Sequence, residues 1–205
     1  MNKLRSLTIS GLRSAGFTMI ELLIVISILG ILAVAVLSAI NPVEQINRGR
    51  DTGSQSDAEQ LISAVDRYQA FVGYYPWQEE PNNQTLGTGW LTIETTASWT
   101  DSTDTTCSVL TRLGSTDSGD STCVNSNEVK GAFVSRITAD NYNSLLVYNG
   151  GEPGNSTYVC FAPLSDAFTV KAENRCLGDA GEYGALSPDF PDEACDGTQK
   201  YYCLP

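Results

Sequence analysis

The 205-residue chain contains no histidine. Histidine is the commonest general base and metal ligand in proteins, so neither a Ser-His nor a Cys-His nucleophile pair can be built from this sequence. No Cys-x-x-Cys pair occurs either, which disfavours a zinc site. Acidic residues outnumber basic ones by 24 to 12, whereas binding of nucleic acid needs clustered Lys and Arg. We therefore expect neither an enzyme nor a nucleic-acid-binding protein.

The sequence does contain one long apolar run near its N-terminus. From Leu22 to Ile40, 19 residues carry no charge, and about 20 apolar residues span the hydrocarbon core of a bilayer as a helix. Lys3, Arg5 and Arg13 precede the run, and residues 1–20 contain no acidic residue. Because basic residues stay on the cytoplasmic side, the N-terminus is expected inside and everything after Pro42 outside.

One carboxylate, that of Glu21, lies at the start of this run. Its burial in a membrane costs several kcal/mol unless a partner neutralises the charge. A secretory signal peptide is one alternative, but the run is longer than the usual core of about 7 to 15 residues, and such a core has no use for a glutamate. An ordinary signal anchor, in which the carboxylate snorkels toward the interface, is another.

The residues in front of the run form a more specific signal. Gly16-Phe17-Thr18-Met19-Ile20-Glu21, followed at once by the apolar run, resembles the class III signal of type IV pilins and type II secretion pseudopilins. The resemblance covers about the first 75 residues and implies that a prepilin peptidase cuts between Gly16 and Phe17 and N-methylates Phe17. It also implies that Glu21 serves assembly by pairing with an amino terminus. In a helix that begins at Phe17, Glu21 lies one turn from its own amino terminus, and a neighbouring subunit offers another.

This resemblance implies a structural subunit of a type IV pilus-like surface filament, polymerised through its N-terminal helix. Its partners would be itself and other pilins, the prepilin peptidase, an inner-membrane assembly platform, and the membrane before assembly. The precursor would lie in the inner membrane with its N-terminus inside, and the mature subunit in an extracellular filament. A pseudopilin of a type II secretion system, in a periplasmic pseudopilus, is the alternative. A membrane-anchored binding module or adhesin is a third possibility.

The helix departs from related subunits at one position. They usually carry a proline about 22 residues into the mature chain, where a proline kinks a helix, whereas this sequence has Ser38. We therefore expect any bend to be displaced toward Gly30 or Pro42.

The chain is predicted to divide into three parts. Residues 1–16 form the cleaved leader, 17–42 the membrane-spanning and filament-core helix, and 43–205 an extracytoplasmic globular domain. Cleavage removes three basic residues and no acidic one, which takes the formal charge from -12 to -15. An acidic surface of this kind suits an exported, soluble domain.

The globular domain is predicted to be α+β and pilin-like. Apolar residues at three- and four-residue steps predict a helix over 43–72 that continues the N-terminal one, and Gly73 ends it. The stripe comprises Leu61, Ala64, Val65, Tyr68, Phe71 and Val72, and Asp57, Glu59, Gln60, Asp66 and Arg67 fall mostly off it. Tyr74, Tyr75 and Trp77 are expected to pack under the end of this helix.

A small antiparallel sheet over 130–172 is expected to pack on the stripe. Short β-rich runs predict strands over 131–137, 145–148, 158–161 and 167–172, with a hairpin turn at 163–166. Before the sheet, 78–122 is predicted to be an exposed Ser/Thr-rich loop region, since 16 of the 31 residues from Thr92 to Thr122 are Ser or Thr. This insertion and the cysteine-containing tail are larger than the usual additions to a major secretion pseudopilin, which favours the pilus.

All six cysteines lie in the part predicted to be external, where up to three disulfides can form: Cys107, Cys123, Cys160, Cys176, Cys195 and Cys203. Their 15 pairings remain open from sequence alone. Short separations favour Cys107 with Cys123 and Cys195 with Cys203, which leaves Cys160 with Cys176.

The tail, residues 177–205, is acidic. We expect no cofactor, and the one candidate ligand is calcium, which prefers carboxylate oxygens such as those of Asp189, Asp192 and Asp196. Their spacing matches no calcium-binding loop, and a solvated acidic tail is the commoner explanation of such a run.

Overall fold

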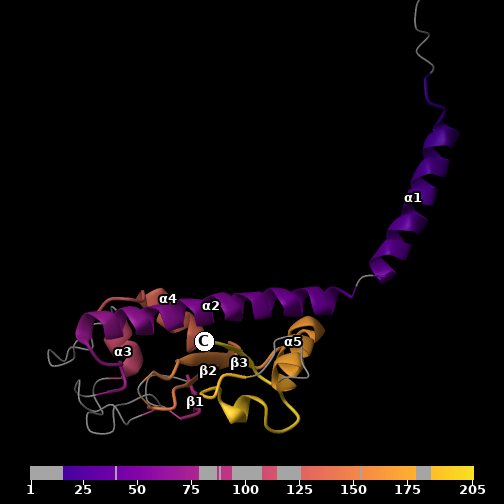
Figure 1. Ribbon diagram of the computed structural model, residues 1–205. Helices are drawn as coiled ribbons and strands as arrows, with labels where there is room; N and C mark the ends of the chain where they lie inside the picture. Colours follow the sequence, from indigo (N-terminus) through magenta and orange to yellow (C-terminus); the bar gives the residue numbers. More distant parts are fainter. Residues whose placement is uncertain are drawn as a thin grey trace, which may run out of the picture. The chain divides into compact units, whose positions relative to one another are not determined.

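The computed structural model describes residues 16–39, 41–78, 87, 89–93, 108–114, 126–152, 154–178 and 186–205. The chain forms two units, residues 1–42 and 43–205, which are described separately. The first contains α1 (Met19–Ala39), and the second, here called the head, contains all the other elements (Figure 1).

Helix α1 is apolar on every side, and its described side chains are all exposed. Its segment Met19–Ser38, with a mean hydropathy of 2.9, is long and apolar enough to cross a membrane, although an N-terminal signal sequence would meet the same criterion. Gly30 lies within the helix. Asn41 is not helical, and α2 (Pro42–Val72) begins at the proline. The predicted single helix is therefore two helices, because proline disfavours a helical residue before it and suits the first position of a new helix.

One face of α2 is buried in the head. The predicted stripe is confirmed for Leu61, Ala64, Val65 and Tyr68, each 0% exposed. Phe71 was predicted to belong to it and is 80% exposed, because the helix passes the edge of the core in its last turn.

Gly73 ends the helix as predicted, with a φ of +92° and an N–H that donates to the Gln69 carbonyl over 2.8 Å. The aromatic residues that follow pack under the helix end, as predicted. Tyr74 meets Tyr68 edge to face, and Tyr75 stacks on the buried Trp77.

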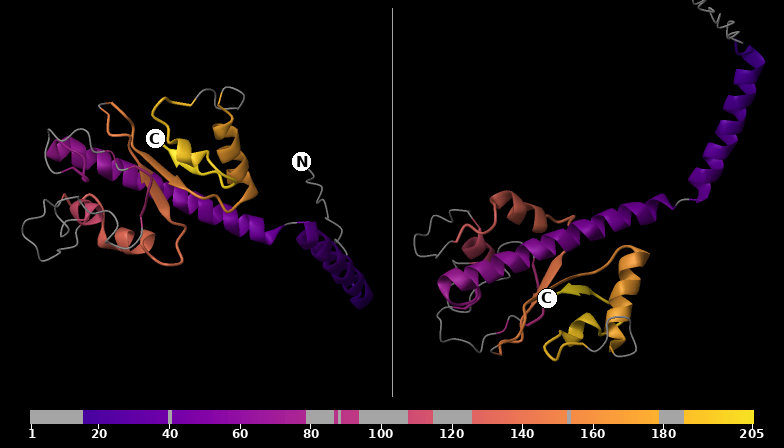
Figure 2. Two further views of the ribbon diagram at one scale, coloured as in Figure 1. Left: turned by 90° about the horizontal axis from the view of Figure 1, so that it is seen from below. Right: turned by 45° about the horizontal axis from the view of Figure 1, so that its top comes forward.

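Four strands, Leu91–Thr92 (β1), Leu145–Tyr148 (β2), Tyr158–Phe161 (β3) and Tyr202–Leu204 (β4), form an antiparallel sheet in that order. Helix α2 crosses one face of this sheet (Figure 2). Alternate residues of β2 and β3, such as Val147 and Val159, join the core under α2. Leu146 and Tyr158 point the other way and pack with Phe190 of the tail. Both faces of the sheet are thus covered.

Two predicted strands are wrong. Residues 131–137 form α4 (Gly131–Ile137), and residues 167–172 lie in α5 (Asp166–Cys176). Both segments are rich in β-formers, but their buried residues recur at helical spacing, as Phe133 and Ile137 do in α4. The predicted hairpin turn at 163–166 instead contains the start of α5, where the Ser165 hydroxyl accepts a hydrogen bond from the Phe168 N–H.

The prediction of an exposed loop over 78–122 holds for Gly87 and Gly89 and is wrong for most of the other residues described within it. Ile93, Val109 and Leu113 are buried in the core, the last two on α3 (Val109–Leu113). Arg112 of this short helix is buried and donates to the carbonyls of Pro76 and Gln78 over 3.2 and 2.8 Å. The remaining residues of 78–122 lie outside the described part of the chain.

The predicted pairing of the last four cysteines is wrong. The disulfides are Cys160–Cys203 and Cys176–Cys195. The tail returns to the sheet as β4, whose register places Cys203 opposite Cys160. A strand of three residues has no periodicity to reveal this return from the sequence. Cys107 and Cys123 lie outside the described residues.

A buried carboxylate joins α2 to the start of α5. Asp51 is 0% exposed, and its oxygens accept hydrogen bonds from the N–H of Leu164 (3.0 Å), the N–H of Ser165 (2.8 Å) and the Ser165 hydroxyl (2.6 Å). One turn earlier on α2, the Asn47 amide donates to the Leu164 carbonyl over 3.0 Å. These contacts compensate the cost of burying the charge, because several donors point at it.

We expect Asp51→Ala to lower the free energy of unfolding by about 2 to 4 kcal/mol, because it leaves three donors, two of them buried, without their acceptor. Denaturant unfolding of the full chain in detergent, followed by the fluorescence of the head, measures the loss. Asp51→Asn keeps an acceptor and should lose less. Asp66→Ala, at an exposed position of the same helix, is the matched control and should stay within about 0.5 kcal/mol. Equal effects of the Asp51 and Asp66 variants would contradict the assigned role.

Candidate functional site

The first turn of α1 holds a reciprocal pair of hydrogen bonds between Thr18 and Glu21. The Thr18 N–H and hydroxyl both donate to Oε2 of Glu21 over 2.9 Å. In return, the Glu21 N–H donates to Oγ1 of Thr18 over 3.3 Å. This is a capping box, in which the two residues satisfy each other's unpaired groups at the helix start. The Thr-x-x-Glu spacing of Thr18 and Glu21 is itself a sequence signal of such a box.

The capping box satisfies one of the two carboxylate oxygens of Glu21 from within the chain. Both bonds fall on Oε2, and no group among the described residues donates to Oε1. The charge is therefore stabilised in part by its own chain, while one oxygen stays available to a further donor. A carboxylate in an apolar segment gains most from a cationic donor, such as an amino terminus.

The predicted cleavage site lies directly before this turn. Gly16 and Phe17 are not helical, and Phe17 is 84% exposed. The Gly16–Phe17 peptide bond is thus accessible and free of helical hydrogen bonding, which is what a peptidase requires of its substrate. Cleavage there would leave the new amino group of Phe17 one residue from the capping box. The leader as far as residue 15 lies outside the described residues.

Of the three calcium candidates, Asp189 is hydrogen-bonded within the head, whereas the other two are exposed. Asp189 accepts hydrogen bonds from the Ser156 N–H (2.6 Å), the Tyr158 hydroxyl (3.1 Å) and the Ser187 hydroxyl. The Ser187 hydroxyl, followed by the Ser156 N–H, lowers the pKa of Asp189 to about 2. Asp189 therefore fastens the tail to β3. Asp192 and Asp196 are exposed, and within the described residues no group of three or more acidic or cysteine side chains is placed to hold a metal.

Comparison with known proteins identifies the N-terminal segment alone. Residues 11–37 match the family model described as the prokaryotic N-terminal methylation motif. No curated protein and no solved structure matches the chain. The matched residues include Gly16, Phe17, the capping box and most of α1. Together with the apolar helix and an α+β head whose long helix packs on an antiparallel sheet, the match confirms the resemblance to type IV pilins and pseudopilins.

We expect Glu21→Ala to leave cleavage intact and to lower the yield of polymer at least tenfold, because the resemblance to pilins assigns this carboxylate to assembly, a step that follows processing. Thr18→Val should give a smaller loss, since it removes the hydroxyl of the capping box and keeps the Thr18 N–H. Immunoblots of cell and sheared fractions measure precursor, mature subunit and polymer. Ser27→Ala is the matched control, because it also removes a hydrogen-bonding hydroxyl from α1. Normal polymer yield from Glu21→Ala would contradict the role of the charge.

We expect Asp189 to make stability depend on pH at the acid end. Its pKa is lowered in the folded state, so its contribution is complete above its ordinary value of 3.8 and is lost as pH falls toward about 2. The free energy of unfolding should therefore fall less steeply between pH 4 and pH 2 in Asp189→Asn than in the wild type. Asp196→Asn, an exposed acidic residue of the same tail, should leave that slope unchanged. Parallel slopes for the wild type and Asp189→Asn would contradict this assignment.

Proposed function

We propose that this chain is a structural subunit of a type IV pilus-like surface filament. The observation that carries the proposal is the methylation motif over residues 11–37, placed so that its glutamate caps the first turn of an apolar helix. The motif implies processing by a prepilin peptidase and assembly with other pilins, and the apolar helix suits a membrane-anchored precursor.

The apolar surface of α1 and its single carboxylate explain why the subunit would leave the membrane for a polymer. Its exposed, uniformly apolar surface needs lipid around it before assembly and other helices around it afterwards. Cleavage after Gly16 creates a cationic amino group on Phe17. In a polymer, that group on one subunit can donate to Oε1 of Glu21 on the next. Pairing the two charges lowers the cost of keeping Glu21 in an apolar environment, which favours the polymer over the isolated helix in the membrane.

The head favours a surface filament over a secretion pseudopilus. Its tail covers the outer face of the sheet and is closed by two disulfides, which makes it a larger addition than a major secretion pseudopilin usually carries. The Ser/Thr-rich insertion adds further polar chain to the head. A pseudopilin would carry the same motif and be processed in the same way, so the length of the polymer separates the two functions. In both, the chain supplies assembly contacts and no catalytic group.

The test is to examine the mature subunit and its polymer in the native host. We expect mass spectrometry to find a chain that begins with N-methylated Phe17, and electron microscopy to find long filaments that a specific antibody decorates. Gly16→Leu should leave only the precursor, because a bulky side chain then occupies the cleavage position. A matched Gly30→Leu substitution, inside α1, should still be processed.

Other outcomes would decide against this function. An intact Met1 on the chain would support an anchored binding module. Short periplasmic polymers, together with a defect in protein secretion on deletion of the gene, would support a pseudopilin.

A further inference from the structure

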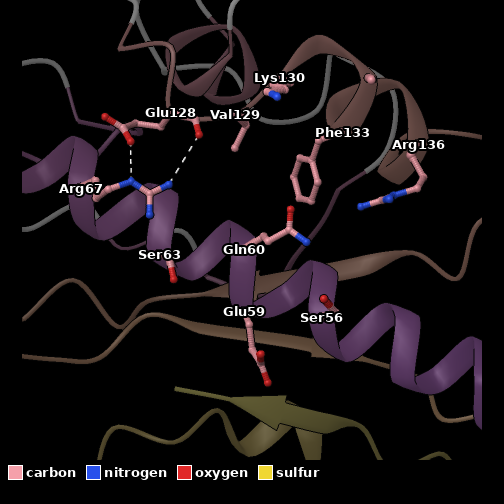
Figure 3. Close-up of a pocket in the computed structure, with 11 residues that line it drawn as sticks. Ser56, Glu59, Gln60, Ser63, Arg67, Glu128, Val129, Lys130, Phe133 and Arg136 are labelled. Carbon is pink, nitrogen blue, oxygen red and sulfur yellow. Dashed lines mark hydrogen bonds and ion pairs between the residues drawn. The ribbon is translucent and has the colours of Figure 1, made fainter.

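A groove runs along the exposed side of α2. Its larger part, of about 690 Å³, lies between α2 and the segment that leads into α4, with Ser63 and Gln60 on one side and Phe133 on the other (Figure 3). A second hollow of about 490 Å³ continues past Arg136 as far as Arg50. Between Arg50 and Arg67 the groove follows about 25 Å of helix, at a rise of about 1.5 Å per residue. It is long enough to hold a short peptide segment.

The groove holds the positive charges of the head that have no partner. All nine basic residues beyond the leader lie in the described part of the chain, and seven of them have a partner there. Ion pairs engage Arg48, Arg67 and Arg136. Carbonyl groups accept hydrogen bonds from Arg112 and Lys200. Aromatic rings lie beneath the cations of Lys171 and Arg175. The other two, Arg50 and Lys130, have no partner among the described residues, and both line the groove.

Lys130 is placed to receive an anion. It is exposed and lies at the N-terminus of α4, where its side chain caps nothing. Its ammonium group lies at the rim of the groove, apart from the Arg67–Glu128 pair that closes one end (Figure 3). The two acids that line this part of the groove, Glu128 and Glu59, are engaged by Arg67 and by the Gln55 amide. A carboxylate that entered here would therefore meet a cation that neither acid neutralises.

Acidic groups without partners lie on the opposite flank of the head. The tail from Cys176 to Gln199 contains six acidic residues and no basic one. Asp192, Glu193 and Asp196 are exposed, and their carboxylates make no hydrogen bond or ion pair with any described residue. Both views of Figure 2 show α4 on one side of α2 and the C-terminal segment on the other. The segment that carries Lys130 and the segment that carries these acids therefore lie on different sides of α2.

We propose that this groove, around Lys130, binds the acidic 192–196 segment of a second copy of this chain. The inference rests on the proposed filament function. The two surfaces are different and lie on opposite flanks, so their contact is head to tail and leaves one free groove and one free acidic segment at the ends of any polymer. It also supplies local attraction between heads whose formal charge of -14 each, from 9 basic and 23 acidic residues, would otherwise repel.

Zero-length crosslinking tests the contact directly. A carbodiimide joins an amine to a carboxylate only where the two touch. In purified filaments we expect peptides that link Lys130 to Asp192, Glu193 or Asp196. The same reaction on detergent-solubilised monomer should not give them, because the two groups lie on opposite flanks of one head.

Substitutions supply the controls. Lys130→Arg keeps the charge and removes the reactive amine, so it should abolish the crosslink and leave the filament yield unchanged. Lys130→Glu should lower the yield about two- to fivefold at low salt, the range expected of an exposed ion pair, and less at high salt. Adding Glu193→Lys should restore the yield. Lys171→Glu, a matched charge reversal outside the groove, should have no such salt-dependent effect.

The outcomes separate this proposal from the proposed function. Filaments in which Lys130 crosslinks only to other carboxylates, or in which Lys130→Glu has no effect on yield, would overturn the groove contact and leave the filament function standing. A wild-type chain that forms no polymer would overturn both.

Discussion

The head depends on a single buried face of α2 that changes character along its length. Toward the N-terminus this face is polar, with Asp51, Ser54 and Asp57 buried. From Ala58 to Tyr68 it is apolar. Residues at three- and four-residue steps lie on the same side of a helix, so these two halves form one continuous strip. The polar half binds other elements of the head by hydrogen bonds, and the apolar half packs on the sheet by burying apolar surface.

The polar half works by directed hydrogen bonds. Asp51 accepts from the backbone and hydroxyl groups at the start of α5, and Asp57 accepts from Arg136 and from the Tyr142 hydroxyl. Burial and the hydrogen bond to Asp57 raise the pKa of Tyr142, so this hydroxyl stays a donor throughout the physiological range. The apolar half gains instead from removing area from water against the inner face of the sheet. The tail then covers the outer face, held there by two disulfides and by Asp189.

Most charged groups of the head are satisfied by partners in the same chain, whereas a few charged groups keep bonding capacity for another subunit. Within the head, buried carboxylates have several donors each, and most cations are paired, which makes the fold self-sufficient. At Glu21, and at Lys130 and the acidic segment of the tail, bonding capacity is left over. Unsatisfied groups of this kind cost little in water, but they gain when another subunit supplies the partner. In the proposed filament, the N-terminal helix supplies the main assembly contact, and the heads add a weaker, salt-sensitive one.

Several features can be predicted from the sequence alone: the processing signal, the apolar helix, the end of α2 at Gly73 and the strands β2 and β3. Each is a local pattern, read from residues within one or two turns of each other. The capping box was equally local and could have been recognised from Thr18 and Glu21. Other features follow from long-range packing: segments 131–137 and 167–172 are helices, Asp51 and Asp57 are buried, and Cys160 is bonded to Cys203. Those outcomes depend on partners more than 40 residues away in the chain, whose contacts override local propensity and leave no periodic trace in the sequence.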